Sequence, residues 1–98
     1  MADFWIIDYK ERFHEDEPDK VDIKKHPRCI AVDVDSVVTI ENFDTIIEDA
    51  PTEMGYEEGE KYEHEQFLIE VDNGWTYKAI VLSKVDDNEV LDTLVKAP

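Results

Sequence analysis

Carboxylates are the side chains through which this chain could do chemistry, and they are densest between Glu41 and Glu65. That segment holds ten carboxylates and one base, Lys61, so its net charge is −9. The whole chain of 98 residues has a net charge of −16. Self-repulsion of this size destabilises a small domain, and solubility needs less charge. We therefore expect the field to serve binding. A surface that normally holds the DNA backbone, with one charge per ~1.7 Å of duplex, would match it.

The acidic surface extends beyond this segment in both directions. Asp33 and Asp35 lie two residues apart on a strand pattern, which would place them ~6.6 to 6.8 Å apart on one face, a plausible spacing for successive phosphates. Residues 10–27 are different, since five bases nearly balance six acids there. The predicted partner-binding residues are Asp33, Asp35, Glu41, Asp44, Glu48, Asp49, Glu53, Glu57, Glu58, Glu60, Glu63, Glu65, Glu70 and Asp72.

An enzymatic interpretation starts from the run at 30–38 (IAVDVDSVV), an apolar strand pattern that ends in Asp-x-Asp. It resembles the first motif of haloacid-dehalogenase-type phosphotransferases, and 79–83 (AIVLS) resembles their second motif. The resemblance implies that Asp33 is a nucleophile and Asp35 a general acid and base. The family requires a doubly wound sheet, whereas this chain shows no helix between its strands. We therefore interpret both aspartates as the solvent face of an amphipathic strand and expect no catalytic residue.

Histidine and cysteine give no metal-binding pattern, and we expect no metal and no cofactor. His14, His26 and His64 are far apart, and none pairs with Cys29 at ligand spacing. His64 is expected to be exposed in a loop. Cys29 adjoins an apolar strand and is expected to be a buried, inert thiol. A single cysteine excludes an intrachain disulfide, which together with the absence of a signal peptide predicts a cytoplasmic location.

The first half of the chain contains short strand patterns. Residues 4–9 (FWIIDY) form an apolar, β-branched run that predicts a strand, and residues 10–27 predict a long connection with weak pairing at 21–23. Residues 28–40 alternate with period two until Ser36, where adjacent valines shift the register. A β-bulge or a break into two strands would explain that shift. Residues 43–47 predict a further short strand.

The second half predicts a loop, a hairpin and a helix. Residues 50–62 contain proline, two glycines and many acids, which is typical of a loop. Residues 66–84 predict a hairpin that turns at Asn73-Gly74, because both central residues tolerate positive φ. Residues 87–96 predict a helix capped by Asp86 or Asp87, with Val90, Leu91, Leu94 and Val95 at helical spacing.

Strands followed by one helix predict a single α+β domain over residues 1–98. We expect a small antiparallel sheet of about four to five strands with one C-terminal helix on one face. Trp5, Trp75 and Tyr77 are expected in the core or in cross-strand pairs, with an exposed interface position as the alternative. No apolar run approaches the ~18 to 20 residues of a membrane helix, so we expect no membrane contact.

High negative charge, small size and missing catalytic motifs resemble the loose class of DNA-mimic proteins, many of them phage-encoded. The resemblance implies an inhibitor that occupies the basic DNA-binding surface of a host protein, in the cytoplasm of a bacterial cell if the gene is a phage gene. A histone-like (HU-type) nucleoid protein is the first expectation for the partner. A homodimer would supply a long charged surface more easily than a monomer. Direct binding to nucleic acid is disfavoured by the sign of the charge.

A different kind of binder is the main alternative. An immunity protein or antitoxin that blocks a basic nuclease would gather its acids on one compact epitope. The phosphotransfer enzyme that uses Asp33 and Asp35 is the second alternative. A change of Asp33 to Asn separates these classes, because an enzyme loses turnover completely while a mimic loses affinity gradually. Binding by a mimic also weakens as salt rises.

Overall fold

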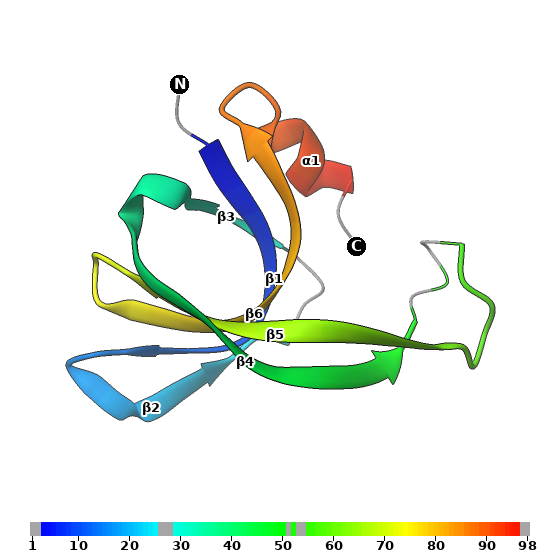
Figure 1. Cartoon of the computed structure of the whole chain (residues 1–98), viewed down its shortest axis with the longest axis horizontal. Helices are drawn as coiled ribbons and strands as arrows, with labels where there is room; N and C mark the ends of the chain where they lie inside the picture. The colour runs from blue at the N-terminus through cyan, green and yellow to red at the C-terminus, as the bar shows by residue number, and fades with distance from the viewer. Residues whose placement is uncertain (1–2, 26–28, 51, 53–54, 97–98) are drawn as a thin grey trace.

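A six-stranded sheet and one short helix make up the computed structural model, which describes residues 3–25, 29–50, 52 and 55–96 (Figure 1). The elements in chain order are β1 (Asp3–His14), β2 (Glu17–Ile23), β3 (Ile30–Asp33), the 3-10 turn η1 (Val34–Ser36), β4 (Val37–Asp49), β5 (Lys61–Val71), β6 (Trp75–Asp86) and α1 (Val90–Lys96). The α+β class with a C-terminal helix is confirmed. The expected four to five strands were too few.

Strand β1 organises the sheet. The strand order is β2-β1-β6-β5-β4, and β3 pairs with β1 off this path. Strand β6 pairs along the length of β1, whereas the other edge of β1 is shared by β3 at residues 4–7 and β2 at residues 11–14. Every pairing between the described strands is antiparallel. An antiparallel sheet can keep one face on the core and the other toward solvent, which suits a chain with this much charge.

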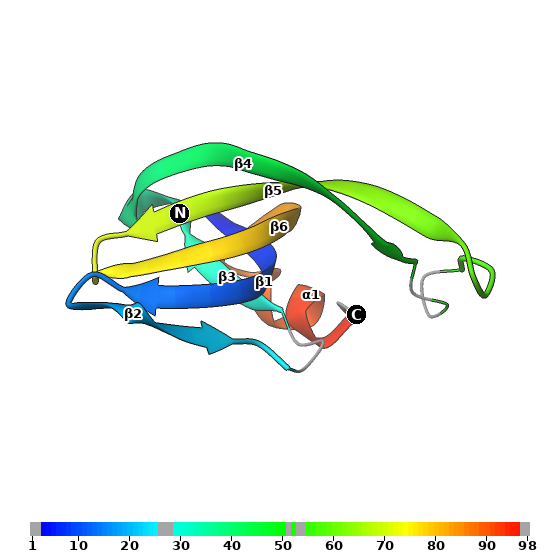
Figure 2. The same ribbon diagram turned by 90° about the horizontal axis from the view of Figure 1, so that it is seen from below.

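The sheet curls so that β3 approaches the far end of β5 (Figure 2). Val32 of β3 belongs to the same buried cluster as Ile69 of β5 and Ala79 of β6. The backbone N–H of Asp72 donates a 2.9 Å hydrogen bond to the carbonyl oxygen of Ser36 in η1. Curling therefore gives a small chain an enclosed core, completed by Ile7, Val71 and Tyr77.

Two turns hold each other at one end of the sheet. The β5–β6 turn lies where it was expected, but of Asn73 and Gly74 only Gly74 has a positive φ, of 91°. The backbone N–H of Glu15, in the β1–β2 turn, donates to the Gly74 carbonyl at 2.8 Å. His14 donates from Nε2 to the Asn73 carbonyl at 3.0 Å. The turn between β5 and β6 is thus part of the packing as well as a connection.

Several sequence expectations about strands were wrong. Residues 10–27 are not a long connection, because β1 continues to His14 and β2 forms a hairpin with it. The pairing expected at 21–23 is confirmed, since these residues pair with 11–13 of β1. The strand expected at 43–47 is the continuation of β4, and β5 starts at Lys61, earlier than the expected residue 66. The register shift at Ser36 is a break into β3 and β4, one of the two expected explanations. Alternation of polar and apolar residues is weak in residues 17–23, so pairing with β1 and not a local pattern defines β2.

Helix α1 packs against β1, β3 and β6. It begins at Val90, three residues later than expected, because residues 87–89 form a turn. The Asp86 carboxylate accepts hydrogen bonds from the backbone N–H groups of Asn88 and Glu89, so it caps that turn and not the helix itself. Val90 and Leu94 are half-buried, whereas Leu91 and Val95 are exposed. The short helix thus buries half of the expected apolar stripe.

Candidate functional site

Half of the acidic segment forms a two-stranded arm that projects from the sheet (Figures 1 and 2). Residues 44–49 of β4 pair with residues 61–66 of β5. Strand β6 pairs with β5 over residues 67–70, so the arm continues beyond the part of β5 that β6 supports. We call residues 44–66 the acidic arm. The carboxylates of its strands, Asp49, Glu63 and Glu65 among them, are thereby fixed to a paired backbone. Residues 55–60 form a loop, as expected for that part of 50–62, whereas 61 and 62 belong to β5.

The arm has two unlike faces, since residues opposite each other in the ladder share a face. The exposed arm face consists of Thr45, Ile47, Asp49, Lys61, Glu63 and Glu65, all of which are exposed. The other face carries exposed Asp44, half-buried Ile46, Tyr62 and His64, and buried Gln66. The backbone of Glu48 pairs with Tyr62. Glu63 and Glu65 therefore provide the pair of carboxylates ~6.6 to 6.8 Å apart on one strand face.

The tip of the arm adds three further carboxylates from Glu57, Glu58 and Glu60. The backbone N–H of Ala50 donates to the Glu60 carbonyl at 2.8 Å and closes the base of the loop. The Glu60 carboxylate accepts a 2.8 Å hydrogen bond from the backbone N–H of Glu57. These contacts tie the Glu60 carboxylate to the turn at the tip. Glu53, also expected in the site, lies outside the described residues.

Aromatic rings stiffen the half-buried face of the arm. Tyr56 stacks on Tyr62 with ring centroids 5.9 Å apart, and Tyr62 meets His64 edge-on at 3.7 Å. His64 was expected to be exposed in a loop, but it lies in the middle of β5 and is half-buried. The expectation failed because residues 61–65 belong to a strand, where every second side chain points to the same face. The alternation of Tyr62, His64 and Gln66 between acids was the available signal.

Asp33 and Asp35 do not share a strand face, contrary to expectation. Asp33 ends β3 and Asp35 lies in η1, where the Asp33 carboxylate accepts a 2.9 Å hydrogen bond from the backbone N–H of Asp35. Asp33 is thus the N-terminal cap of η1. Glu70 also makes a local contact and accepts a 3.1 Å hydrogen bond from the Thr39 hydroxyl. The η1 turn and the end of β5 that leads into the β5–β6 turn lie on the side of the molecule opposite the tip of the arm (Figure 1).

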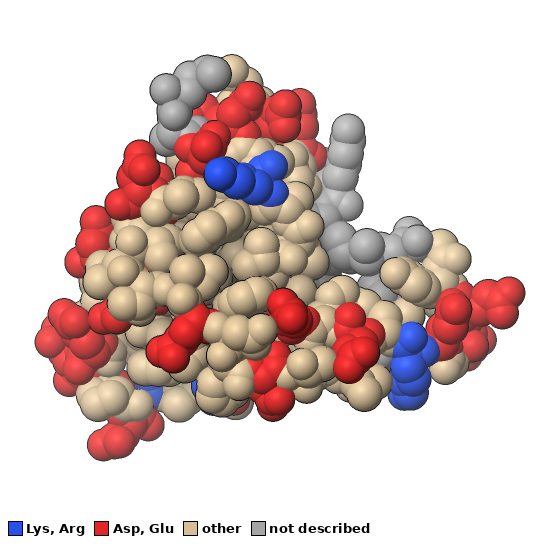
Figure 3. Space-filling view, viewed as in Figure 1, with Lys and Arg blue, Asp and Glu red and all other residues tan. Residues whose placement is uncertain are grey.

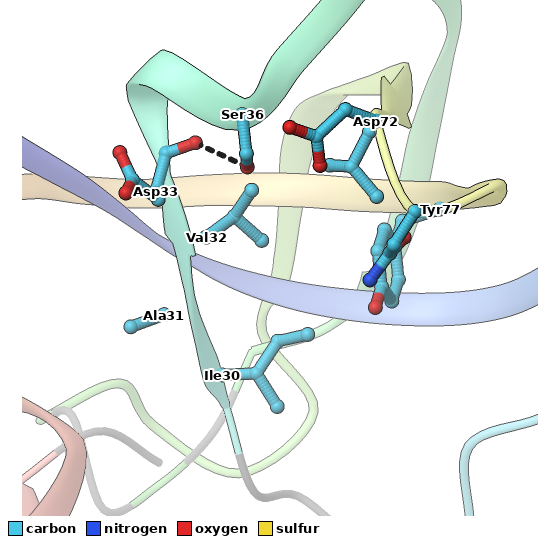
Figure 4. A pocket seen from close by; sticks show the side chains of 9 residues that line it. Ile30, Ala31, Val32, Asp33, Ser36, Asp72 and Tyr77 are labelled. Carbon is cyan, nitrogen blue, oxygen red and sulfur yellow. Dashed lines mark hydrogen bonds between the residues drawn. The ribbon is translucent and has the colours of Figure 1, made fainter.

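A shallow pocket separates β3 from the β5–β6 turn (Figure 4). Its volume is about 180 Å³, and Asp33, Ser36, Asp72 and Tyr77 are among its lining residues. The Ser36 hydroxyl donates to the Asp33 carbonyl at 2.7 Å. Ligand pockets usually enclose ~300 Å³ or more, so this pocket is small for a ligand site. The phosphotransfer motif also requires a parallel, doubly wound sheet, which the antiparallel pairing of these strands does not supply.

Bases and acids are segregated on the molecule. Ion pairs among the described residues cluster on and beside β1, β2 and β6. Arg12 pairs with Asp22, Lys24 with Asp8, and Lys78 with Glu11. Lys61 is the one base of the acidic arm and pairs with Asp49. Figure 3 shows acidic side chains along the arm and around the margin of the face in view, with a mostly uncharged centre. The acidic arm therefore carries nine carboxylates in its sequence against one base, Lys61.

Exposed apolar side chains on β4 were missed by the sequence reasoning. Val38, Ile40, Phe43 and Ile47 are all exposed, although they lie among four acids of the same strand. The Phe43 ring lies 4.8 Å from the ammonium nitrogen of Lys78, a cation–π contact. The available signal for these exposed apolar side chains was the high proportion of apolar residues in a strand that also carries four acids. The β4 surface thus combines acidic and apolar side chains.

Aromatic and thiol expectations for the body of the sheet are confirmed. Tyr77 is buried in the core and meets Tyr9 edge-on, while Trp75 packs against His14 and lies 4.3 Å from the Arg12 guanidinium. Trp5 packs against the core cluster. Cys29 is buried, and burial raises the pKa of its thiol, which disfavours the reactive thiolate.

The comparisons leave the fold and the acidic arm as the basis for function. The chain matches no protein-family model, no curated protein and no solved structure. Within the described residues, no cluster of three His, Cys, Asp or Glu side chains is arranged to hold a metal ion. No helix in that same part of the chain is long and apolar enough to cross a membrane.

Proposed function

We propose that this protein is a non-enzymatic inhibitor that mimics the DNA phosphate backbone and occupies the basic DNA-binding surface of a host protein. The observation that carries the proposal is the acidic arm. It is a paired, projecting element with exposed carboxylates at Asp49, Glu63 and Glu65 and three more at its tip. A projecting element can enter a groove that excludes the body of the sheet.

The dimensions and charge of the molecule suit the same role. Its longest dimension is 41 Å, which equals about 12 base pairs of duplex with about 24 phosphate charges. The chain carries 26 carboxylate side chains and a net charge of −16, or about one net charge per 2.6 Å of that length. A duplex carries one per ~1.7 Å, so the protein approaches but does not reach the charge density of DNA. A homodimer would lengthen the charged surface further.

The first candidate for the partner is a histone-like nucleoid protein of a bacterial cell, where the chain would act in the cytoplasm. Such a protein binds duplex DNA through the phosphate backbone without reading bases, so charge and spacing alone suffice for competition. An immunity protein for a basic nuclease remains the alternative, and it too would use the arm. The two candidates differ in whether the partner cleaves DNA.

A capture experiment tests the proposal. The immobilised protein is exposed to a bacterial lysate at low salt, eluted with a salt gradient, and the retained basic proteins are identified. Recovery of a duplex-binding protein that elutes with salt is the expected result. Recovery of no DNA-binding protein, or retention that does not weaken as salt rises, would count against it.

A further inference from the structure

We infer that the outer edge of β4 binds an extended basic segment of the partner as an additional strand of the sheet. The inference rests on the proposed function, because the basic charge of the partner follows from that proposal. It adds a second kind of contact, backbone pairing along the outer edge of β4, whose residues 44–49 also belong to the acidic arm.

The edge is available and unusually long. Strand β4 is the last in the order β2-β1-β6-β5-β4, and in the part of the chain that the structure describes it pairs with β5 alone. It runs for 13 residues, whereas strands commonly have about 5 to 6. Its outer N–H and C=O groups are thus a template for another strand.

Part of the usual protection of such an edge is missing. Natural edges are often blocked by lysine or proline, and β4 contains neither. Its two register irregularities, at 37–39 and 42–44, leave a regular stretch of ladder between residues 44 and 49. Apolar side chains are exposed along the strand, with Val38 59% and Ile47 68% accessible. These side chains gain burial when a neighbouring strand covers them.

Charge selects which strand can bind. Strand β4 carries Glu41, Asp44, Glu48 and Asp49 and no base. A second copy of the chain would set these acids against each other, and like charges across a ladder are destabilising. Lysine or arginine at alternate positions of a partner strand would neutralise them. The contact between Phe43 and Lys78 already shows one such combination of an apolar β4 side chain with a cation.

A synthetic peptide of alternating lysine and valine, about nine residues long, is the probe. It is added to the full-length, isotopically labelled protein, and backbone amide shifts are followed by NMR. Perturbation centred on β4, with slowed amide exchange along that strand, is the expected result. A peptide of the same sequence with methylated backbone nitrogens on alternate residues should bind at least about tenfold more weakly, because strand addition depends on backbone hydrogen bonds. Equal binding of the methylated peptide would overturn the inference.

Two variants with the same change of charge locate the contact. Val38→Lys/Ile40→Lys places lysine at exposed positions of β4 outside the acidic arm, whereas Leu91→Lys/Val95→Lys places it at exposed apolar positions of α1. Figure 2 shows α1 on the side of the molecule away from β4. We expect the β4 variant to bind the peptide about tenfold more weakly than the α1 variant. An equal loss of peptide affinity in both variants would show attraction to net charge only. A β4-dependent dimer of the unmodified protein would show that a second copy occupies the edge. Either result overturns the inference. Salt-dependent capture of a basic partner by the β4 variant would leave the DNA-mimic proposal standing.

Discussion

Glu63 lies opposite Ile47 across the ladder that joins β5 to β4, and both side chains are exposed. A carboxylate and an apolar side chain thus share the exposed arm face. Under the proposed function, this pair would offer the partner a large aliphatic side chain beside a carboxylate, which the phosphate backbone of a duplex does not offer. The carboxylate supplies long-range attraction that falls with salt, and the isoleucine supplies short-range burial that does not. A partner held by both would dissociate more slowly than its charge alone predicts.

Salt should stabilise the free protein. Screening shortens the range of the repulsion between carboxylates, so Tm should rise when sodium chloride increases from about 0.02 M to about 0.5 M. Glu63→Gln/Glu65→Gln should raise Tm at low salt and should reduce the response to salt. Glu17→Gln/Asp19→Asn on β2 is the matched control, because it removes two exposed charges from a segment that also contains Lys20. A Tm that falls with salt would contradict this account of the repulsion.

Gly74→Ala should destabilise the fold more than Gly59→Ala. Both glycines have positive φ, 91° and 84° respectively, so alanine introduces backbone strain of ~1 kcal/mol or more at either position. A Cβ at Gly74 would also lie 2.7 Å from Nε2 of His14, whereas a Cβ at Gly59 meets open space. Urea denaturation would measure the difference, expected at ~1 to 2 kcal/mol. Equal losses of stability at Gly74 and Gly59 would show that the β1–β2 and β5–β6 turns do not support each other.

Arg12→Lys should loosen the junction of β1, β2 and β6. The Arg12 Nε donates to the Asp22 carboxylate at 2.8 Å, and its guanidinium carbon lies 4.3 Å from the centre of the Trp75 ring. The hydrogen bond to Asp22 raises the pKa of Arg12, so the group stays charged in use. Lysine keeps the charge but loses the planar stacking, at a cost of ~0.5 to 1 kcal/mol. Lys20→Ala, at a more exposed ion pair with Glu17, should change stability by less.

Cys29 should react slowly with thiol reagents in the folded protein. Burial raises the pKa of its thiol, so the thiolate is scarcer in the folded state than in the unfolded chain. Modification near pH 8 should accelerate about tenfold or more in urea. The same shift means that the folded state retains a proton that the unfolded state releases. Its contribution to stability is therefore complete below the unfolded pKa of ~8.5 and is lost as pH rises through the folded pKa. Equal rates in buffer and urea would exclude a protected thiol.

The sequence allowed the hairpin turn, the helix and the antiparallel class to be predicted because each depends on local chemistry. Gly74 supplies the positive φ of the turn, and the C-terminal residues have helical spacing. The β1–β2 hairpin and the arm were not predictable in this way. Polar residues such as Glu17–Ile23 become a strand because β1 offers a partner, and β2 is exposed at every position. Pairing partners are a tertiary property that alternation does not encode.

The candidate site was predictable in composition but not in arrangement. Asp33 and Asp35 have strand spacing, yet Asp33 caps η1 and the chain breaks between β3 and β4. Glu63 and Glu65, which looked like loop residues, provide the ordered pair instead. Asp33 and Asp35 lie apart because the chain turns at η1 between β3 and β4, where the sheet curls. Glu63 and Glu65 share a face because β4 and β5 continue as paired strands into the arm. A local pattern of acids predicts neither the turn at η1 nor the pairing of β4 with β5.

The central claim is tested most directly by competition for a histone-like nucleoid protein. A fluorescent DNA duplex of about 20 base pairs is bound to the purified nucleoid protein, and its displacement by this chain is followed by anisotropy at several salt concentrations. The account predicts full displacement, an inhibition constant that weakens steeply with salt, and at least a several-fold loss for Glu63→Gln/Glu65→Gln but not for Glu17→Gln/Asp19→Asn. Failure to displace DNA at low salt, or equal loss in the arm and control variants, would contradict it.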